Sequence, residues 1–191
     1  MGNFQKQKQD FLSKIDKSRK GSIDEKMRPI VKIVNSVPNY YTTSCCAGRI
    51  VLLHQISGKK QESNWLFSSH SLVKTAQLKK AISKSALPKK GIVWILTEAP
   101  IMHIACKTLD DAWKLLAIIK QGGFKRTHII SSTQNKTTIE AFGTQRIEMP
   151  IAESGKLVIP LPSLSKLVQH SNRKLKQSHK LLKKLEQELR K

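Results

Sequence analysis

Two adjacent strand patterns between residues 91 and 106 place the strongest limit on what this chain can fold into. Gly91 to Leu96 is a continuous apolar run, which is typical of a buried strand, and Ile101 to Cys106 alternates like a second strand. The segment Glu98-Ala99-Pro100 bends the chain between them. Apolar runs this short cannot cross a bilayer, which takes about 20 consecutive apolar residues. We therefore expect buried strands in a folded core and no integral membrane protein.

Helical patterns alternate with strand patterns along the rest of the chain. Helices are expected at residues 3–17, at 72–87 and from Pro162 to Lys191. Another helix is expected to follow the capping-box sequence Ser22-Ile23-Asp24-Glu25. A further helix is expected from Thr108 to Gly122, with an apolar stripe of Trp113, Leu116 and Ala117. Further strands are expected at 40–56, at 65–69 and within 127–150. This interleaving lacks a strict βαβ repeat, so it predicts a mixed α/β or α+β fold: a mixed β-sheet core with flanking helices and a long basic C-terminal helix.

Length and glycine placement narrow the architecture further. A chain of 191 residues with 39% apolar composition can bury one substantial core, and we expect a single domain spanning residues 1–191. None of its nine glycines forms a G-x-G sequence. The usual glycine loop of a Rossmann methyltransferase is therefore not expected.

Charge is the strongest compositional signal. The chain carries 35 Lys and Arg against 13 Asp and Glu, a formal net charge of +22. Such a field attracts polyanions, which makes nucleic acid the leading partner. The alternative is a merely lysine-rich surface, but in that case Glu usually rises together with Lys.

Location and metal content follow from what the chain lacks. The N-terminus is polar and basic without a secretory pattern, so a cytoplasmic location is expected. Three cysteines form neither an even disulfide framework nor a four-ligand zinc pattern, and the histidines are scattered. We expect reduced thiols and no metal.

The small-residue patch Ser44-Cys45-Cys46-Ala47-Gly48, followed by Arg49, is the leading candidate site. Small side chains let a planar base or a cofactor approach the backbone, and a guanidinium binds phosphate or carboxylate with two parallel hydrogen bonds. The alternative is a glycine bulge that only bends a strand.

Four segments of the chain resemble the wybutosine-synthesizing protein 3 family of tRNA methyltransferases in order and approximate spacing. They are Asp16-Lys17-Ser18-Arg19-Lys20-Gly21-Ser22-Ile23-Asp24, Asn35-Ser36 with Tyr40-Tyr41-Thr42-Thr43-Ser44-Cys45-Cys46-Ala47-Gly48-Arg49, Trp65-Leu66-Phe67-Ser68-Ser69-His70, and Glu98-Ala99-Pro100-Ile101-Met102-His103. The resemblance implies methyl transfer from S-adenosylmethionine to N4 of a wyosine-type tricyclic base beside the anticodon of phenylalanine tRNA. It also implies a fold other than the usual nucleotide-binding methyltransferase fold.

The resemblance also implies which residues form the site. A base of near-neutral pKa that removes a proton from the ring nitrogen would be His103 or Glu98, although alignment of donor and acceptor could suffice without a base. The expected cofactor- or substrate-binding residues are Thr43, Ser44, Cys45, Gly48, Arg49, His70, Tyr41, Asp16, Ser18 and Lys20. For the histidines the alternative is a hydrogen-bonded core position, and for Tyr41 it is aromatic core packing.

The chain departs from the family pattern at a few of these positions. The family tends to have Ser at Cys45 and Ala47, and an Ile-Arg pair where Phe142-Gly143 stands. These changes leave open a second hypothesis, a non-catalytic RNA-binding protein of the same fold.

Overall fold

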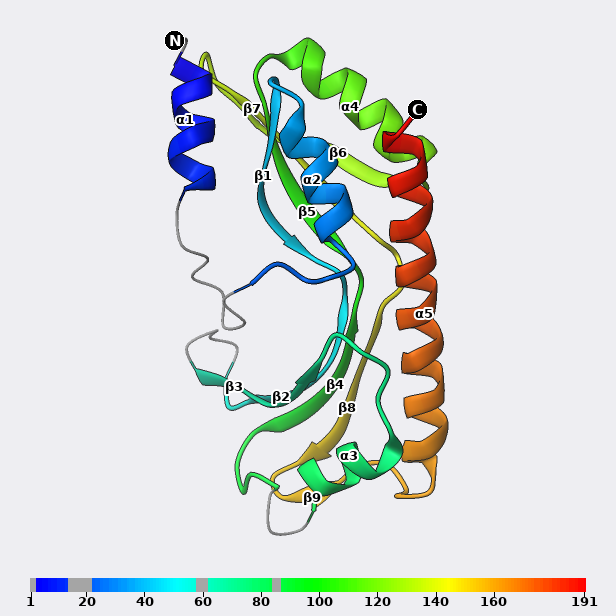
Figure 1. The fold of residues 1–191 in the computed structure, drawn as a ribbon. Coiled ribbons are helices and arrows are strands. Elements are labelled where there is room, and N and C mark those ends of the chain that lie inside the picture. Colours follow the sequence, from blue (N-terminus) through cyan, green and yellow to red (C-terminus); the bar gives the residue numbers. More distant parts are fainter. Residues whose placement is uncertain (1–2, 14–21, 58–61, 84–86) are drawn as a thin grey trace. The chain divides into compact units, whose positions relative to one another are not determined.

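The computed structural model describes residues 3–13, 22–57, 62–83 and 87–191 (Figure 1). The chain divides into two compact units, each assembled from separate segments. Unit 1 comprises Met1–Ala47, Pro100–Thr144 and His179–Lys191, and unit 2 comprises Gly48–Ala99 and Gln145–Ser178. The expectation of a single domain over the whole chain stays a prediction.

Unit 1 contains a four-stranded sheet in the order β1-β5-β7-β6, in which each neighbouring pair is antiparallel. Its strands are β1 (Tyr40–Cys46), β5 (Ile101–Cys106), β7 (Thr137–Phe142) and β6 (Arg126–Ser132). Among the described residues, the helices α1 (Asn3–Leu12), α2 (Arg28–Ser36) and α4 (Leu109–Gln121) belong wholly to this unit.

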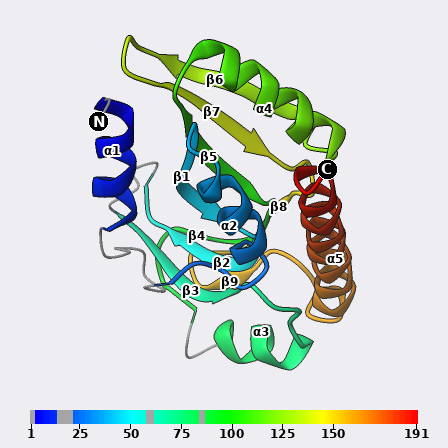
Figure 2. The ribbon, with the colours of Figure 1, turned by 45° about the horizontal axis from the view of Figure 1, so that its top comes forward.

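The two faces of this sheet pack differently. Met102 and Ile104 of β5 point into a core that α2 and α4 complete. The opposite face carries Tyr41 and Ala105, which pack against Phe4 of α1. Figure 2 accordingly shows α1 on one side of β1 and β5, and α2 and α4 on the other. His103 and Glu140, which lie further along that face, have partly exposed side chains.

Unit 2 contains a five-stranded antiparallel sheet in the order β3-β2-β4-β8-β9. Its strands are β3 (Ser63–Ser69), β2 (Arg49–Gln55), β4 (Ile92–Glu98), β8 (Ile147–Glu153) and β9 (Lys156–Leu157), and it also contains helix α3 (Thr75–Ala81). Ile50, Leu52 and Ile95 are fully buried at the centre of its core. Strands β2 and β3 form the hairpin that the sequence predicts.

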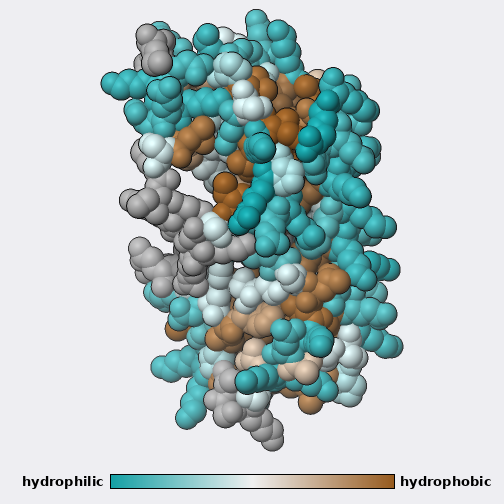
Figure 3. Space-filling view, viewed as in Figure 1, coloured by the Kyte–Doolittle hydropathy of each residue, from teal (hydrophilic) through white to brown (hydrophobic). Residues whose placement is uncertain are grey.

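The last helix, α5 (Ser163–Leu189), contributes side chains to both cores. Leu164, Val168 and Leu175 belong to the core of unit 2, and Leu182 and Leu185 to that of unit 1. Lysines and arginines occupy many of the exposed positions of the helix, and Figure 3 shows a hydrophilic surface over its outer side. The expected leucine stripe of a basic C-terminal helix is therefore confirmed.

The α+β class and the absence of a Rossmann strand order are confirmed, while three local expectations need correction. Helix α2 begins at Arg28, with Met27 at its N-cap and no side-chain cap, so the expected capping box at Ser22 does not form. In α4 the buried stripe is Ala112, Leu115, Leu116 and Ile119, whereas Trp113 is 55% exposed. Helix α3 is shorter than expected. Among the described residues, none of the helices has the length and apolar character that spanning a membrane requires.

Candidate functional site

A β-bulge at Thr43 sets the direction of the side chains in the predicted patch of unit 1. Strand β1 pairs Thr42 with Ile104 and Ser44 with His103, so Thr43 is the extra residue. A bulge re-aims the side chains that follow it. As a result Ser44, rather than Thr43, lies directly opposite His103. The bulge is fixed on both sides, because Thr43 Oγ1 donates to the carbonyl of His103 at 3.2 Å and Thr42 donates its amide and hydroxyl to Asn35 of α2.

Four polar side chains continue this pairing in a row across the sheet, one from each strand. Ser44 Oγ lies 2.7 Å from His103 Nδ1, and His103 Nε2 lies 2.7 Å from Glu140 Oε2. The other oxygen of Glu140 lies 3.4 Å from His128 Nε2. The side chains of His103 and Glu140 are 27% and 23% exposed, so the row is accessible from solvent yet held by its neighbours. We call these four residues the polar row.

Ser44 and His103 are predicted site residues, whereas Glu140 and His128 are not among the residues predicted from the sequence. Glu140 has a local signal, because it alternates with Ile139 and Ala141, which are buried in the core of unit 1. That alternation places the glutamate on the opposite face of the sheet. What the sequence does not show is the register that pairs Glu140 with both His103 and His128.

The predicted residues of unit 2 meet around Arg49. Its Nε donates a hydrogen bond to the carboxylate of Glu98, which lies directly opposite on β4. Its guanidinium carbon lies 4.0 Å from the ring centroid of Trp65 on β3. A cation over an aromatic face gains about 0.5–2 kcal/mol, and the planar guanidinium carries five N–H donors. Glu98 is therefore an ion-pair partner of Arg49 in this structure.

His70 follows β3, and its Nδ1 lies 3.0 Å from the carbonyl oxygen of Gly48. Gly48 has a φ of 88°, in the left-handed region where glycine is favoured because it has no Cβ. The two predicted histidines lie on different sheets, since His70 follows a strand of unit 2 and His103 lies in unit 1. They are therefore not on neighbouring strands.

The remaining predicted binding residues are Tyr41, Cys45 and a group of three residues before α2. Tyr41 is only 2% exposed and packs between Phe4 and Phe11, at ring-centroid distances of 5.3 and 5.5 Å, and burial raises the pKa of its hydroxyl. Cys45 is partly buried and packs against the core of unit 1. Asp16, Ser18 and Lys20 lie outside the described residues. The assignment of all five residues as binding residues stays a prediction.

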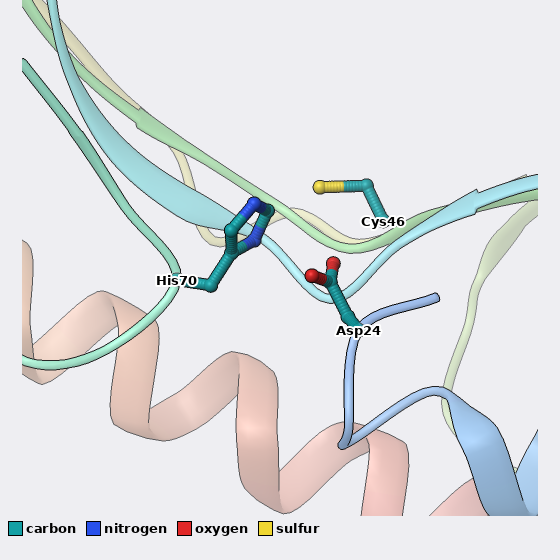
Figure 4. Close-up of side chains that lie close together, drawn as sticks. All are labelled: Asp24, Cys46 and His70. Atoms are coloured by element: carbon teal, nitrogen blue, oxygen red, sulfur yellow. The ribbon is translucent and has the colours of Figure 1, made fainter. Parts of the chain in front are cut away.

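Asp24 ties the segment before α2 to the end of β1. Its Oδ2 accepts a hydrogen bond from the backbone amide of Ala47 at 2.9 Å, and a carboxylate oxygen lies within 4.8 Å of the sulfur of Cys46. Figure 4 shows these two side chains, together with His70 of unit 2. Within unit 1 they provide two possible ligand atoms, and structural zinc sites use four. The expectation that the protein holds no metal stays a prediction.

Known proteins match nearly the whole length of this chain. The model of a family described as methyltransferase TYW3 matches residues 6–191. A tRNA(Phe) 7-((3-amino-3-carboxypropyl)-4-demethylwyosine(37)-N(4))-methyltransferase 1 of Pyrococcus horikoshii is 33% identical over 189 residues, which cover 98% of this chain and 95% of that relative. A tRNA wybutosine-synthesizing protein 3 homolog of Bos taurus is 32% identical, and the alignment covers 93% of this chain and 69% of the relative.

Solved structures agree with these sequence matches. A structure of the PH1069 protein from Pyrococcus horikoshii matches with a TM-score of 0.88 and 33% identity, covering 98% of this chain and 96% of that one. A structure from Aeropyrum pernix has a TM-score of 0.73 at 20% identity, which supports the fold alone.

Proposed function

The chain belongs to the methyltransferase TYW3 family, and from this membership we propose that it transfers a methyl group from S-adenosylmethionine to N4 of a 4-demethylwyosine-type base in phenylalanine tRNA. The observation that carries the proposal is the extent of the match. A relative named for this reaction is 33% identical and is aligned over 95% of its length, so nearly the whole of that relative has a counterpart here. The alternative of a non-catalytic RNA-binding protein is not favoured.

The methyl donor fits the side chains of the predicted site. When bound, S-adenosylmethionine supplies an electrophilic methyl group on a sulfonium, and it also carries a carboxylate and a planar adenine. A guanidinium such as that of Arg49 binds a carboxylate with directional hydrogen bonds, and Trp65 beside it is 36% exposed and offers an aromatic face. We assign Arg49, Gly48 and His70 to ligand binding in unit 2, and Thr43, Ser44 and Cys45 to ligand binding in unit 1. Glu98 orients Arg49.

His103 is the residue to which we assign acid–base chemistry. A ring nitrogen that carries a proton must lose it when it gains a methyl group, and histidine is the side chain best suited to accept a proton near neutral pH. His103 is partly exposed and is hydrogen-bonded on both ring nitrogens.

The tRNA partner is supported by the charge of the chain, +22 overall, and by its distribution along α5. Lys166, Arg173, Lys180 and Lys184 are exposed and recur at helical spacing opposite the buried stripe. Cations in such a row bind the phosphate backbone without reading sequence, and their affinity falls steeply with salt. We also propose that the protein acts in the cytoplasm.

The experiment is a methyl-transfer assay followed by nucleoside mass spectrometry. Purified protein, S-adenosylmethionine and phenylalanine tRNA that carries the N4-demethylated tricyclic base should yield one added methyl group on that base. The same tRNA with an unmodified guanosine at that position should yield none. If the protein gives no product under conditions in which the Pyrococcus horikoshii relative does, the proposal is wrong.

A further inference from the structure

The contacts of the polar row determine which atom donates and which accepts in each hydrogen bond. The proposed function alone does not require this arrangement. A carboxylate can only accept hydrogen bonds, so the contact with Glu140 Oε2 places a hydrogen on Nε2 of His103. The neutral ring then has a bare Nδ1, which can only accept, and Ser44 Oγ lies 2.7 Å from it. The hydroxyl of Ser44, which is an exposed residue, therefore donates to His103.

Glu140 is itself held from the other side. His128 lies opposite it on β6, and its Nε2 is 3.4 Å from Oε1, so each carboxylate oxygen faces one imidazole. The ring of His128 packs edge-on against Phe142, at a centroid distance of 6.0 Å, and the guanidinium of Arg126 lies over the same phenyl ring. Among the described residues, the printed contacts link His103 to the carboxylate of Glu140 on the neighbouring strand β7, and through it to His128 on β6.

We propose that Ser44, His103 and Glu140 act as one relay that removes the proton displaced by methylation. Ser44 and His103 pass the proton on, while Glu140 and His128 are positioning residues. This inference rests on the proposed methyltransferase function and adds to it the path of the proton. Ser44 is the group that touches the substrate nitrogen, and His103 acts through it. The arrangement resembles the serine–histidine–carboxylate relays in which the carboxylate fixes the tautomer of the base.

The step balances in atoms and charge. A bond forms between N4 and the methyl carbon, the carbon–sulfur bond breaks, and its electron pair remains on sulfur as a neutral thioether. The proton of N4–H passes to Ser44 Oγ while the hydroxyl proton passes to Nδ1 of His103. The positive charge that began on the sulfonium ends on the imidazolium, where the carboxylate of Glu140 stabilises it, and solvent later removes the proton.

The kinetic experiment uses Glu140→Gln, which keeps the size of the side chain and removes its charge. Methyl transfer is measured in a single turnover with saturating S-adenosylmethionine and modified tRNA, and the affinity for each is measured separately. The rate should fall about 100-fold with both affinities unchanged. Glu148→Gln is the matched control, because it removes a glutamate of strand β8 from an ion pair with Arg146, and it should keep the wild-type rate.

A cycle of Ser44→Ala and His103→Asn tests whether the relay acts as one unit. Each variant should lose about 100-fold, and the double variant should be no slower than the slower single variant, because members of one relay do not contribute independently. Multiplied losses in the double variant, or a wild-type rate in Ser44→Ala or in Glu140→Gln, overturn the relay.

A measurement on the folded protein separates this inference from the methyltransferase proposal. Nitrogen-15 NMR of the imidazoles should show neutral His103 protonated at Nε2 and bare at Nδ1, and Glu140→Gln should change that tautomer population. This result needs neither tRNA nor turnover, so it stands even if no methylation is found. A neutral ring protonated at Nδ1 overturns the relay, even in a protein that methylates its tRNA.

Discussion

The carboxylate of Asp24 accepts a hydrogen bond from the backbone amide of Ala47, at 2.9 Å and out of contact with water. It thereby fixes the last residue of unit 1 before the chain enters unit 2. The sequence places Asp24 in a capping box, but the helix begins four residues later and the side chain serves β1 instead. The end of the predicted site is therefore held by a residue far from it in sequence.

Replacing Asp24 by Ala should lower the free energy of unfolding by about 1–3 kcal/mol, because a buried amide loses its acceptor. Urea denaturation followed by circular dichroism measures the change. Glu25→Ala, at the exposed neighbouring position, serves as the control and should stay within about 0.5 kcal/mol of the wild type. Equal effects of the two substitutions would contradict the assigned role of Asp24.

Asp111 gives unit 1 a stability that depends on pH. Burial raises the pKa of its carboxyl, but hydrogen bonds from Thr108 and Asn39 outweigh that effect, and the net pKa lies below the ordinary 3.8. A depressed folded pKa means that the stabilisation is fully present above about pH 4 and is lost as pH falls through the lower folded value.

Asp111→Asn should therefore cost about 1–3 kcal/mol at pH 7, and this difference from the wild type should shrink below pH 3.8. Denaturant titrations at pH 7 and at descending acidic pH measure it. The exposed neighbour Asp110 provides the control, because Asp110→Asn should show a small effect throughout. A cost for Asp111→Asn that stayed constant down to the lowest pH would show that charge plays no part.

The three thiols should differ in reactivity. Burial, with a smaller contribution from the charge of Asp111, raises the pKa of Cys106 to about 12, and its side chain is fully buried. Cys45 and Cys46 are partly exposed. Because the thiolate is the reactive form, iodoacetamide at pH 8 should label Cys45 and Cys46 in the folded protein and Cys106 only after unfolding. Peptide mass spectrometry reads out each site, and rapid native labelling of Cys106 would refute its burial.

Patterns with a local period were predictable from the sequence. The β2–β3 hairpin, the strands at 92–98 and 101–106, and the leucine stripe of α5 all follow from alternation or helical spacing within one segment. Thr108 also caps α4 as expected, with its hydroxyl accepting from the amide of Asp111. In each case the residues that decide the structure are neighbours along the chain.

Features that depend on partners far along the chain were not predictable. Strands β4 and β5 are joined by a short bend, yet they belong to different sheets, so the pairing could not be read from their proximity. The polar row depends on a one-residue bulge at Thr43, and without it Ser44 would not face His103. Trp113 shows the limit of hydrophobicity as a guide, because the helix buries Ala112 and Leu116 and leaves the larger tryptophan exposed.

Two glycines with the same backbone conformation should tolerate alanine differently. Gly91 and Gly155 have φ values of 80° and 81°, but a Cβ at Gly91 would clash with the carbonyl oxygen of Gln55, whereas at Gly155 the nearest atom is 3.7 Å away. Gly155→Ala should cost about 1–2 kcal/mol for the left-handed conformation alone. Gly91→Ala should cost about 1–3 kcal/mol more, because the clash is with backbone. Urea denaturation compares them, and equal losses would contradict the close approach.

Arg49 offers the sharpest test of the binding role proposed for unit 2. In Arg49→Lys the positive charge stays, but the planar group that lies over Trp65 and pairs with Glu98 is lost. The dissociation constant for S-adenosylmethionine should rise about 10-fold, since an ammonium cannot bind a carboxylate with two parallel hydrogen bonds. Isothermal titration calorimetry measures the constant without tRNA. Arg146→Lys makes the same change at an exposed ion pair with Glu148, and its affinity should equal that of the wild type. If both variants bind the donor as the wild type does, Arg49 has no part in holding it.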